Sequence, residues 1–104
     1  MAHRGQSTPH TLSIVVAGNT GNTTVNMGGL VLGIGIQAPD SSSNYDLSVL
    51  DGDGYGLVGR TALMGDNTIK ERWHADPFEG QTFTLSNAAN GTYSIKVWFD
   101  TFLK

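Results

Sequence analysis

Cysteine is absent from this chain of 104 residues. Its absence excludes disulfide bridges, zinc sites built from thiolates and cysteine nucleophiles. Charge is also sparse, because lysine, arginine, aspartate and glutamate together supply 14% of the residues and the net charge is −3. The six lysine and arginine residues are scattered along the sequence, whereas binding to a phosphate backbone needs a clustered basic face. We therefore predict no nucleic-acid partner.

Long apolar runs are missing as well. No stretch approaches the roughly 18 consecutive apolar residues that indicate a membrane-spanning helix. The first ten residues contain no apolar segment of the kind found at the centre of a secretory signal. We therefore expect no membrane partner. We also expect synthesis in a cytoplasm, from which only a larger assembly would carry the protein out.

The sequence also lacks the motifs that mark common catalytic sites. It has no zinc-binding histidine motif, no Gly-x-Ser-x-Gly elbow and no glycine-rich phosphate loop that ends in Lys-Ser or Lys-Thr. Glu71 with Glu79 or Asp76 would be the candidate acid–base pair, but two carboxylates are ordinary in a small acidic protein. We therefore predict a non-enzymatic protein that needs no cofactor.

The residues that are abundant favour short strands and turns. Fourteen glycines, together with many serines, threonines and asparagines, disfavour helices. Runs of alternating apolar and polar residues predict strands, which we expect at residues 11–17, 24–37, 44–50, 55–59, 67–73, 81–86 and 92–103. Residues 18–23 are predicted to form a turn. Hydrophobic residues make up 38% of the chain, which is enough to form one core.

About seven to eight short strands without an amphipathic helix are typical of an all-β fold. We predict an antiparallel β-sandwich or jelly roll. Residues 1–10 have no apolar run, so we expect a flexible N-terminal arm there, followed by a single β-sandwich domain over residues 11–104.

One short stretch partly matches a known metal-binding motif. Asp51-Gly-Asp53-Gly matches the start of a calcium-binding loop, in which alternate carboxylates converge on one ion. The match then fails, because Tyr55 and Ala62 occupy later ligand positions. An Asp-Gly turn between two strands explains every residue without an ion. We favour this hairpin, with Asp51 and Asp53 as weak metal candidates.

Glycines and aromatic residues indicate candidate contact surfaces. Gly33 and Gly35 leave one face of their strand almost bare, so that another backbone or a large side chain can lie flat on it. Trp98 and Phe102 are out of phase with the predicted core residues of the last strand, and they therefore need cover. Trp73, like Trp98, is a residue type that stacks on sugar rings or anchors protein interfaces.

Three kinds of cover are open for these residues: the protein's own chain, a second subunit, or a sugar. The predicted interface residues are Gly33, Gly35, Trp73, Trp98 and Phe102, together with Pro9 and His10 of the arm.

Two stretches resemble known β-sandwich modules. The segments 44–55, Asn-Tyr-Asp-Leu-Ser-Val-Leu-Asp-Gly-Asp-Gly-Tyr, and 90–98, Asn-Gly-Thr-Tyr-Ser-Ile-Lys-Val-Trp, are similar to the hairpin and closing strand of bacterial pre-peptidase C-terminal domains. This resemblance implies a fold and no activity. Those modules are secreted appendages of larger proteins, whereas we expect this chain to act as a free-standing protein.

The chain as a whole resembles another family. With its Gly-Ile-Gly-Ile-Gln-Ala-Pro39 segment and Gly-Asn-Thr loop, it is similar in style to small capsid decoration, or cement, proteins of tailed bacteriophages. The resemblance implies a homo-oligomer that binds the major capsid protein on the capsid surface of the virion, with an arm that reaches across capsomers. The alternatives are a carbohydrate-binding module, built on Trp73 or Trp98, and a tail or fibre adhesin domain.

Overall fold

The computed structural model describes residues 7–75 and 78–100, with side chains for residues 10–75 and 78–99. Within these residues, regular structure is confined to nine strands. They are β1 (Ser7–Val16), β2 (Thr20–Asn26), β3 (Gly29–Gln37), β4 (Asn44–Leu50), β5 (Gly56–Met64), β6 (Asn67–Ile69), β7 (Trp73–Ala75), β8 (Gly80–Ser86) and β9 (Gly91–Asp100). No helix in this part of the chain is long and apolar enough to cross a membrane.

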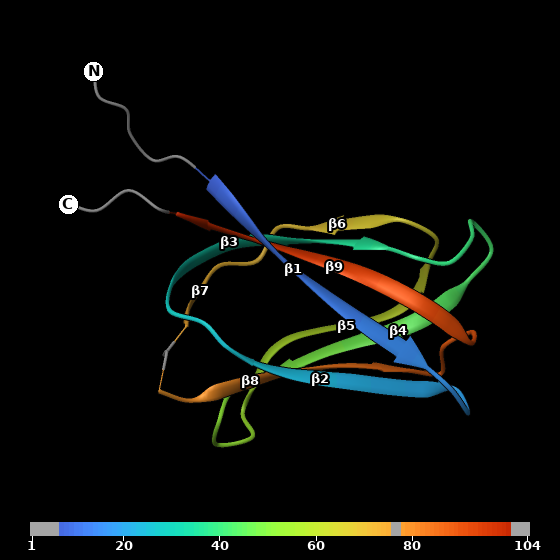
Figure 1. Cartoon of the computed structure of the whole chain (residues 1–104), viewed down its shortest axis with the longest axis horizontal. Coiled ribbons are helices and arrows are strands. Elements are labelled where there is room, and N and C mark those ends of the chain that lie inside the picture. Colours follow the sequence, from blue (N-terminus) through green and yellow to red (C-terminus); the bar gives the residue numbers. More distant parts are fainter. Residues whose placement is uncertain (1–6, 76–77, 101–104) are drawn as a thin grey trace.

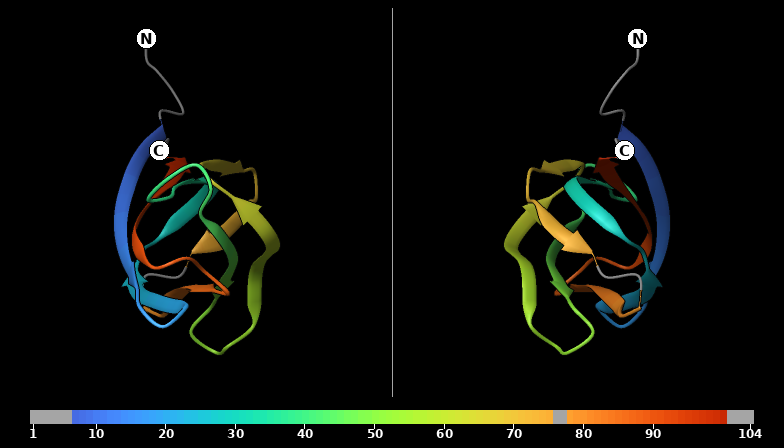
Figure 2. Two further views of the ribbon diagram at one scale, coloured as in Figure 1. Left: turned by 90° about the vertical axis from the view of Figure 1, so that its right-hand side faces the viewer. Right: turned by 90° about the vertical axis from the view of Figure 1, so that its left-hand side faces the viewer.

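The strands form two antiparallel sheets that pack face to face (Figure 1). The first sheet has the order β1-β9-β3-β6, and β7 also pairs with β3. The second sheet has the order β2-β8-β4-β5. In the end-on views of Figure 2, β1 lies along one side of the molecule and β5 along the other. The predicted antiparallel β-sandwich is therefore confirmed.

The structure has more strands than we predicted because two expected elements were misjudged. The segment 18–23 was predicted as a turn, but Gly18 and Asn19 alone complete it, with φ angles of 66° and 72°. Two consecutive positive φ angles are what a two-residue hairpin turn requires. Strand β2 therefore starts at Thr20, and the expected strand over residues 24–37 divides into β2 and β3. The stretch 67–73 likewise divides between β6 and β7.

The first strand begins earlier than the sequence indicated. Residues 7–10 were assigned to the arm, but they continue the β1–β9 ladder, in which Ser7 pairs with Asp100 and His10 with Val97. The ladder extends this far because β9 offers backbone partners along its whole length, so the polar side chains of residues 7–10 do not end the pairing. Residues 1–6 and 101–104 lie outside the described residues.

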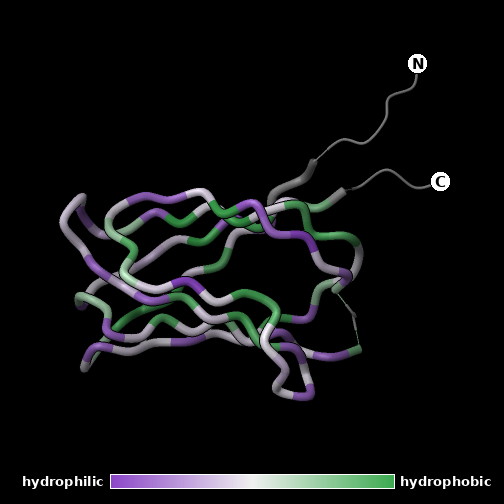
Figure 3. Tube along the Cα trace, turned by 180° about the vertical axis from the view of Figure 1, so that it is seen from behind, coloured by the Kyte–Doolittle hydropathy of each residue, from purple (hydrophilic) through white to green (hydrophobic). Residues whose placement is uncertain are grey.

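The core lies between the two sheets and is built from alternate residues of the long strands. Its largest fully buried side chains are Tyr45, Tyr93, Phe83, Ile14, Ile34, Leu47, Leu85 and Ile95. Figure 3 shows apolar segments that alternate with polar ones along the strands of both layers. The rings of Tyr45 and Tyr93, one from each sheet, meet edge to face at 5.4 Å. Such a contact adds to the free energy of burial.

Strand β3 contains a bulge that corrects our assignment of its two faces. Strict alternation, on which the predicted strand 24–37 was based, would place Leu30 and Leu32 in the core together with Ile34 and Ile36, but the register against β9 shifts between Val31 and Gly33. Ile34 and Ile36 are buried as expected, whereas Val31 takes the inward position and the two leucines are only partly buried. One extra residue in a strand reverses the face of every residue before it.

Two tyrosine hydroxyls fix the loops at one end of the sandwich. Tyr93 Oη, at the start of β9, donates a hydrogen bond to the carbonyl of Ala89 at 2.8 Å, the arrangement known as a tyrosine corner in β-sandwiches. Tyr45 Oη donates to the carbonyl of Gly65 at 2.7 Å. Both loops are thereby tied to core residues, which holds the ends of β5 and β8 in place.

Candidate binding surface

Most described carboxylates are engaged in holding loops. Asp46 Oδ1 accepts the amide of Ala62 at 2.8 Å, and its Oδ2 accepts Asn87 Nδ2 at 2.8 Å. Asp40 Oδ1 accepts both the amide and the hydroxyl of Ser42. These hydrogen bonds hold the pKa values of Asp40 and Asp46 below the ordinary value of 3.8, because they favour the charged form. Both groups act as anionic caps for the backbone.

Asp51 is also a structural group. Its Oδ1 accepts the amides of Asp53 and Tyr55, each at 2.9 Å, across the turn between β4 and β5. This is the hairpin role that we favoured over a calcium loop. Asp53 lies exposed at the tip of the same turn. Within residues 7–75 and 78–100 there is no group of three His, Cys, Asp or Glu side chains placed to hold a metal ion.

Trp73 lies in the core, which corrects its assignment to the contact surface. The side chain is only 7% exposed, and its Nε1 has no hydrogen-bond partner among the described residues. Its neighbours Arg72 and His74 point outward instead. A buried indole offers no face for a sugar, so a sugar-binding site built on Trp73 is excluded.

The bare face predicted at Gly33 and Gly35 is covered by the protein's own chain. A Cβ atom built on Gly35 would lie 2.7 Å from Cη2 and 2.8 Å from Cζ3 of Trp98, so the indole rests on this glycine. A Cβ atom on Gly33 would lie 3.0 Å from the carbonyl oxygen of Ile69. Of the three kinds of cover left open by the sequence, the structure therefore provides the internal one for both glycines.

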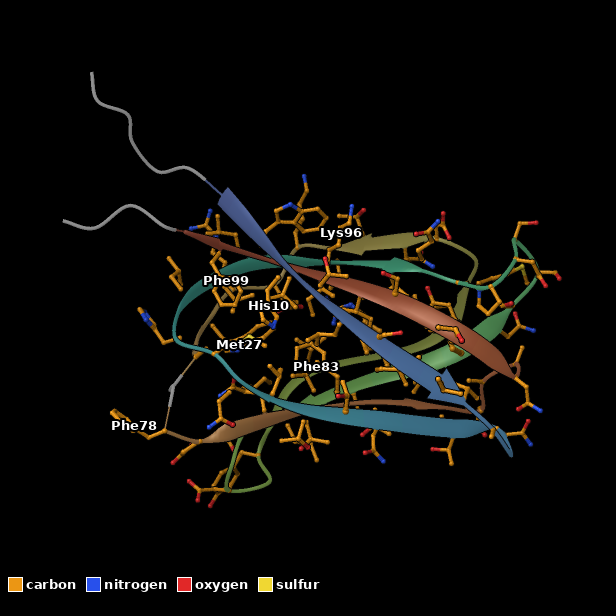
Figure 4. All side chains as sticks on the ribbon, in the orientation of Figure 1. His10, Met27, Phe78, Phe83, Lys96 and Phe99 are labelled. Atoms are coloured by element: carbon orange, nitrogen blue, oxygen red, sulfur yellow. The ribbon has the colours of Figure 1, made fainter. Side chains whose placement is uncertain are left out.

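The other predicted contact residues are placed as follows. His10 is exposed in the first half of β1 and meets the ring of Phe99 edge to face, with the ring centroids 6.4 Å apart. Figure 4 shows the side chains of His10 and Phe99 close together. Pro9 pairs with Trp98 through the backbone. Phe102 lies outside the described residues.

A cleft of about 280 Å³ lies on the outer face of the first sheet, next to Trp98. Its walls come from β3, β6 and β9 and from the turn before β6. The lining residues are Gly35, Ile36, Gln37, Asp66, Asn67, Thr68, Ser94 and Lys96. Sequence reasoning missed this cleft, because its residues are far apart in the chain and meet only through the strand order β9-β3-β6.

Charge is unequally divided between the two sheets. Lys70, Arg72 and Lys96 are exposed on the first sheet or at its edge, and Figure 4 shows Lys96 on the outer side of that sheet. Among the described residues, the remaining Lys or Arg is Arg60, which forms an ion pair with Glu71. The second sheet and its hairpin carry Asp46, Asp51, Asp53 and Glu79, of which Glu79 lies over Gly52.

Large apolar side chains are exposed at several places that the sequence analysis did not single out. Phe78 is 91% exposed and Tyr55 72%, while Val15 and Met64 are also exposed. Single exposed apolar residues are normal on protein surfaces. They therefore do not by themselves define a site.

No protein-family model matches this chain, and no curated protein matches it either. The fold agrees with the β-sandwich that both resemblances implied. A shared fold does not imply a shared function. We therefore base the proposed role on the charged side chains of the surface and on their contacts.

Proposed function

We propose that the protein is a non-enzymatic virion structural protein, an oligomeric capsid decoration or cement protein that binds and stabilises the head of a tailed phage. Its partners are then the major capsid protein and further copies of itself, and its location is the capsid surface. The resemblance of the sequence to small decoration proteins suggests this role.

An uneven distribution of charge over the two sheets is the main support for this proposal. The first sheet exposes Lys70, Arg72 and Lys96, beside the exposed carboxylate of Asp66, and the second sheet with its hairpin carries four carboxylates. Complementary charge steers association and selects the orientation of docking. A slab whose basic residues are concentrated on one sheet therefore suits packing against neighbouring copies or against an acidic capsid surface.

The use of the carboxylates supports a structural role as well. Asp40, Asp46 and Asp51 are bound to backbone amides of their loops, and Glu71 pairs with Arg60. Groups engaged in this way serve the stability of the fold. Many weakly bound copies on a lattice would each add a small increment to the stability of the particle, with avidity supplied by the oligomer.

Light scattering on the purified protein and thermal melting of decorated heads test the proposal. We expect an oligomer and a raised melting temperature of the particles, and both effects should weaken with salt because exposed charges are screened. A monomer that leaves the melting temperature of the heads unchanged would contradict the proposal. Labelled protein found on tails or fibres would support the adhesin alternative.

A matched pair of variants separates face charge from net charge. Lys70→Gln and Asn22→Asp each lower the net charge by one, but Lys70 belongs to the basic side, whereas Asn22 is exposed on β2 of the second sheet. We expect Lys70→Gln to weaken binding to heads and Asn22→Asp to leave it nearly unchanged. Equal effects of the two variants would count against docking through the basic side.

A further inference from the structure

We propose that the cleft beside Trp98 is a binding site for a neutral saccharide. This inference goes beyond the structural role and does not depend on it, because it rests on the geometry of the cleft alone. Gly35 lines the cleft, and the benzo ring of Trp98 lies on the outer side of that glycine. The indole is not itself a lining residue, but it lies beside the cleft, because it contacts the glycine that forms part of the cleft wall.

The indole is held in place and partly exposed. Gly35 has no side chain, so the Cη2–Cζ3 edge of the ring can approach the sheet there, and Trp98 keeps an intermediate exposure to solvent. Aromatic side chains carry a large apolar surface at a low cost in conformational entropy. A ring fixed beside a polar cleft is the element needed to stack against the C–H face of a sugar.

Hydrogen-bond donors and acceptors line the cleft beside the indole. Lys96 offers an ammonium donor and forms no ion pair within the described residues. Asp66 Oδ1 is bound to the amide of Ala38 at 3.0 Å, which fixes the carboxylate and leaves Oδ2 as an acceptor. The hydroxyls of Ser94 and Thr68 serve as donor or acceptor.

Asn67 anchors the wall of the cleft to the core. Its Nδ2 donates to Tyr45 Oη at 2.9 Å and to the carbonyl of Met64 at 3.0 Å. With the amide nitrogen committed in this way, the side-chain oxygen of Asn67 is the atom left for a ligand. A fixed polar group loses less freedom on binding than a mobile one.

The charges select the class of ligand. Lys96 and Asp66 carry opposite charges in one cleft, so an anion would gain from Lys96 and be repelled by Asp66. A sugar hydroxyl donates and accepts at once, and it is therefore suited to a site that presents a cation and a carboxylate together. Volume favours a single ring, because 280 Å³ is at the lower end of the range for small-molecule sites.

The cleft is open to solvent, since Gln37, Asp66, Thr68 and Lys96 are all exposed. Further sugar units of a glycan would continue outward from the bound ring. A ligand of this size bound on one side only reaches a Kd of about 1 mM. Several copies in one assembly would raise the apparent affinity for a dense glycan surface.

Titration of the full-length, ¹⁵N-labelled protein tests the site. The probes are the methyl glycosides of glucose, galactose, mannose and N-acetylglucosamine at millimolar concentration, with methyl glucuronide as the acidic comparison. We expect saturable shifts of the Gly35, Ser94 and Lys96 amides and of the Trp98 indole N–H with at least one neutral glycoside. No saturable shift with any probe would overturn the proposal, and so would shifts confined to residues away from the cleft. Tighter binding of methyl glucuronide than of every neutral glycoside would overturn the proposal that the ligand is a neutral saccharide.

Three variants complete the test. Lys96→Ala and Trp98→Ala should each weaken the binding at least tenfold, whereas Lys70→Ala removes the same charge as Lys96→Ala outside the cleft and should change it less than twofold. Lys96 is exposed, so its variant remains informative if Trp98→Ala fails to fold. Unchanged binding in Lys96→Ala would overturn the assignment. The melting temperature of phage heads is measured separately, so failure of the saccharide site and failure of the structural role are distinguishable.

Discussion

The carboxylate of Asp46 holds Ala62 in a left-handed backbone conformation. Ala62 has a φ of 58°, and its amide donates to Asp46 Oδ1 at 2.8 Å across the β4–β5 pair. The register between these strands shifts in the same region, between Tyr45 and Leu47. Because a non-glycine residue rarely adopts this conformation, the hydrogen bond offsets local strain in β5.

We expect the stability supplied by Asp46 to depend on pH in the acid range. Its pKa in the folded protein lies below the ordinary value of 3.8, because Ala62 and Asn87 donate hydrogen bonds to the charged form. A group with a lowered pKa stabilises the fold above its unfolded value, and this contribution is lost as the pH falls through the folded value. Asp46→Asn should therefore lower the urea midpoint at about pH 7 and have a smaller effect at about pH 3.

Asp53→Asn is the matched control for Asp46. The carboxylate of Asp53 is exposed at the hairpin tip and accepts no hydrogen bond among those within the described residues. Its replacement should change the urea midpoint little at either pH. An equal effect of the two replacements at neutral pH would show that the capping bonds of Asp46 contribute nothing to stability.

Two phenylalanines close together in the sequence should differ greatly in their contribution to stability. Figure 4 shows Phe83 between the sheets and Phe78 pointing away from the sandwich, and the two side chains are 0% and 91% exposed. Phe83→Ala should cost about 3–5 kcal/mol of unfolding free energy, because it leaves a cavity. Phe78→Ala should stay within about 0.5 kcal/mol of the parent protein. Urea unfolding of both variants measures the difference, and a large loss in Phe78→Ala would mean that this ring is buried in an assembly.

Alternation predicted the sandwich well where a strand is regular and bounded by turn residues. Residues 44–50 form β4 with the expected bounds, and their inward positions are buried as predicted. Prediction failed where one residue breaks the period of two, as at the bulge that takes Leu30 and Leu32 out of the core. A bulge leaves no clear signal in a single sequence, since its cause is the pairing with β9.

The candidate site was predictable only in part. The out-of-phase position of Trp98 in β9 indicated correctly that its side chain leaves the core. The same reasoning failed for Trp73, because its burial depends on how the short strand β7 pairs with β3. Asp66 and Lys96 could not be joined from the sequence, since they meet only after three strands have paired.

Tyr45 should make the fold sensitive to alkaline pH. Burial is the main factor that raises the pKa of Tyr45 above its ordinary value of 10.0, and burial also raises that of Tyr93. The folded protein favours the neutral form of Tyr45. The stability that this group contributes is therefore fully present below pH 10.0, and it is lost as the pH rises through the pKa of Tyr45 in the folded protein. Tyr45→Phe should cost about 1–3 kcal/mol at neutral pH, because it removes a buried hydroxyl that donates to the Gly65 carbonyl and accepts from Asn67 Nδ2. It should also reduce the alkaline loss of stability.

Tyr55→Phe provides the comparison for this measurement. Tyr55 is 72% exposed, so its replacement should alter neither the midpoint at neutral pH nor the alkaline decline by a measurable amount. Urea midpoints followed by circular dichroism between about pH 7 and about pH 11 give both quantities. If the urea midpoint of Tyr45→Phe falls as steeply at alkaline pH as that of the parent protein, groups other than Tyr45 cause the loss of stability.

Gly35→Ala should change sign in its effect on stability, depending on the residue at position 98. In the parent protein the new methyl group would lie 2.7 Å from the Trp98 ring. Such overpacking lowers the free energy of unfolding by about 1–3 kcal/mol. In a Trp98→Ala background the clash is gone, and alanine restricts the unfolded chain more than glycine does, which stabilises by about 0.4–1 kcal/mol. A double-mutant cycle measured by urea unfolding at about pH 7 gives the coupling directly. If Gly35→Ala has the same effect in both backgrounds, the indole does not contact this glycine in solution, and Trp98 is then not placed to stack on a ligand in the cleft.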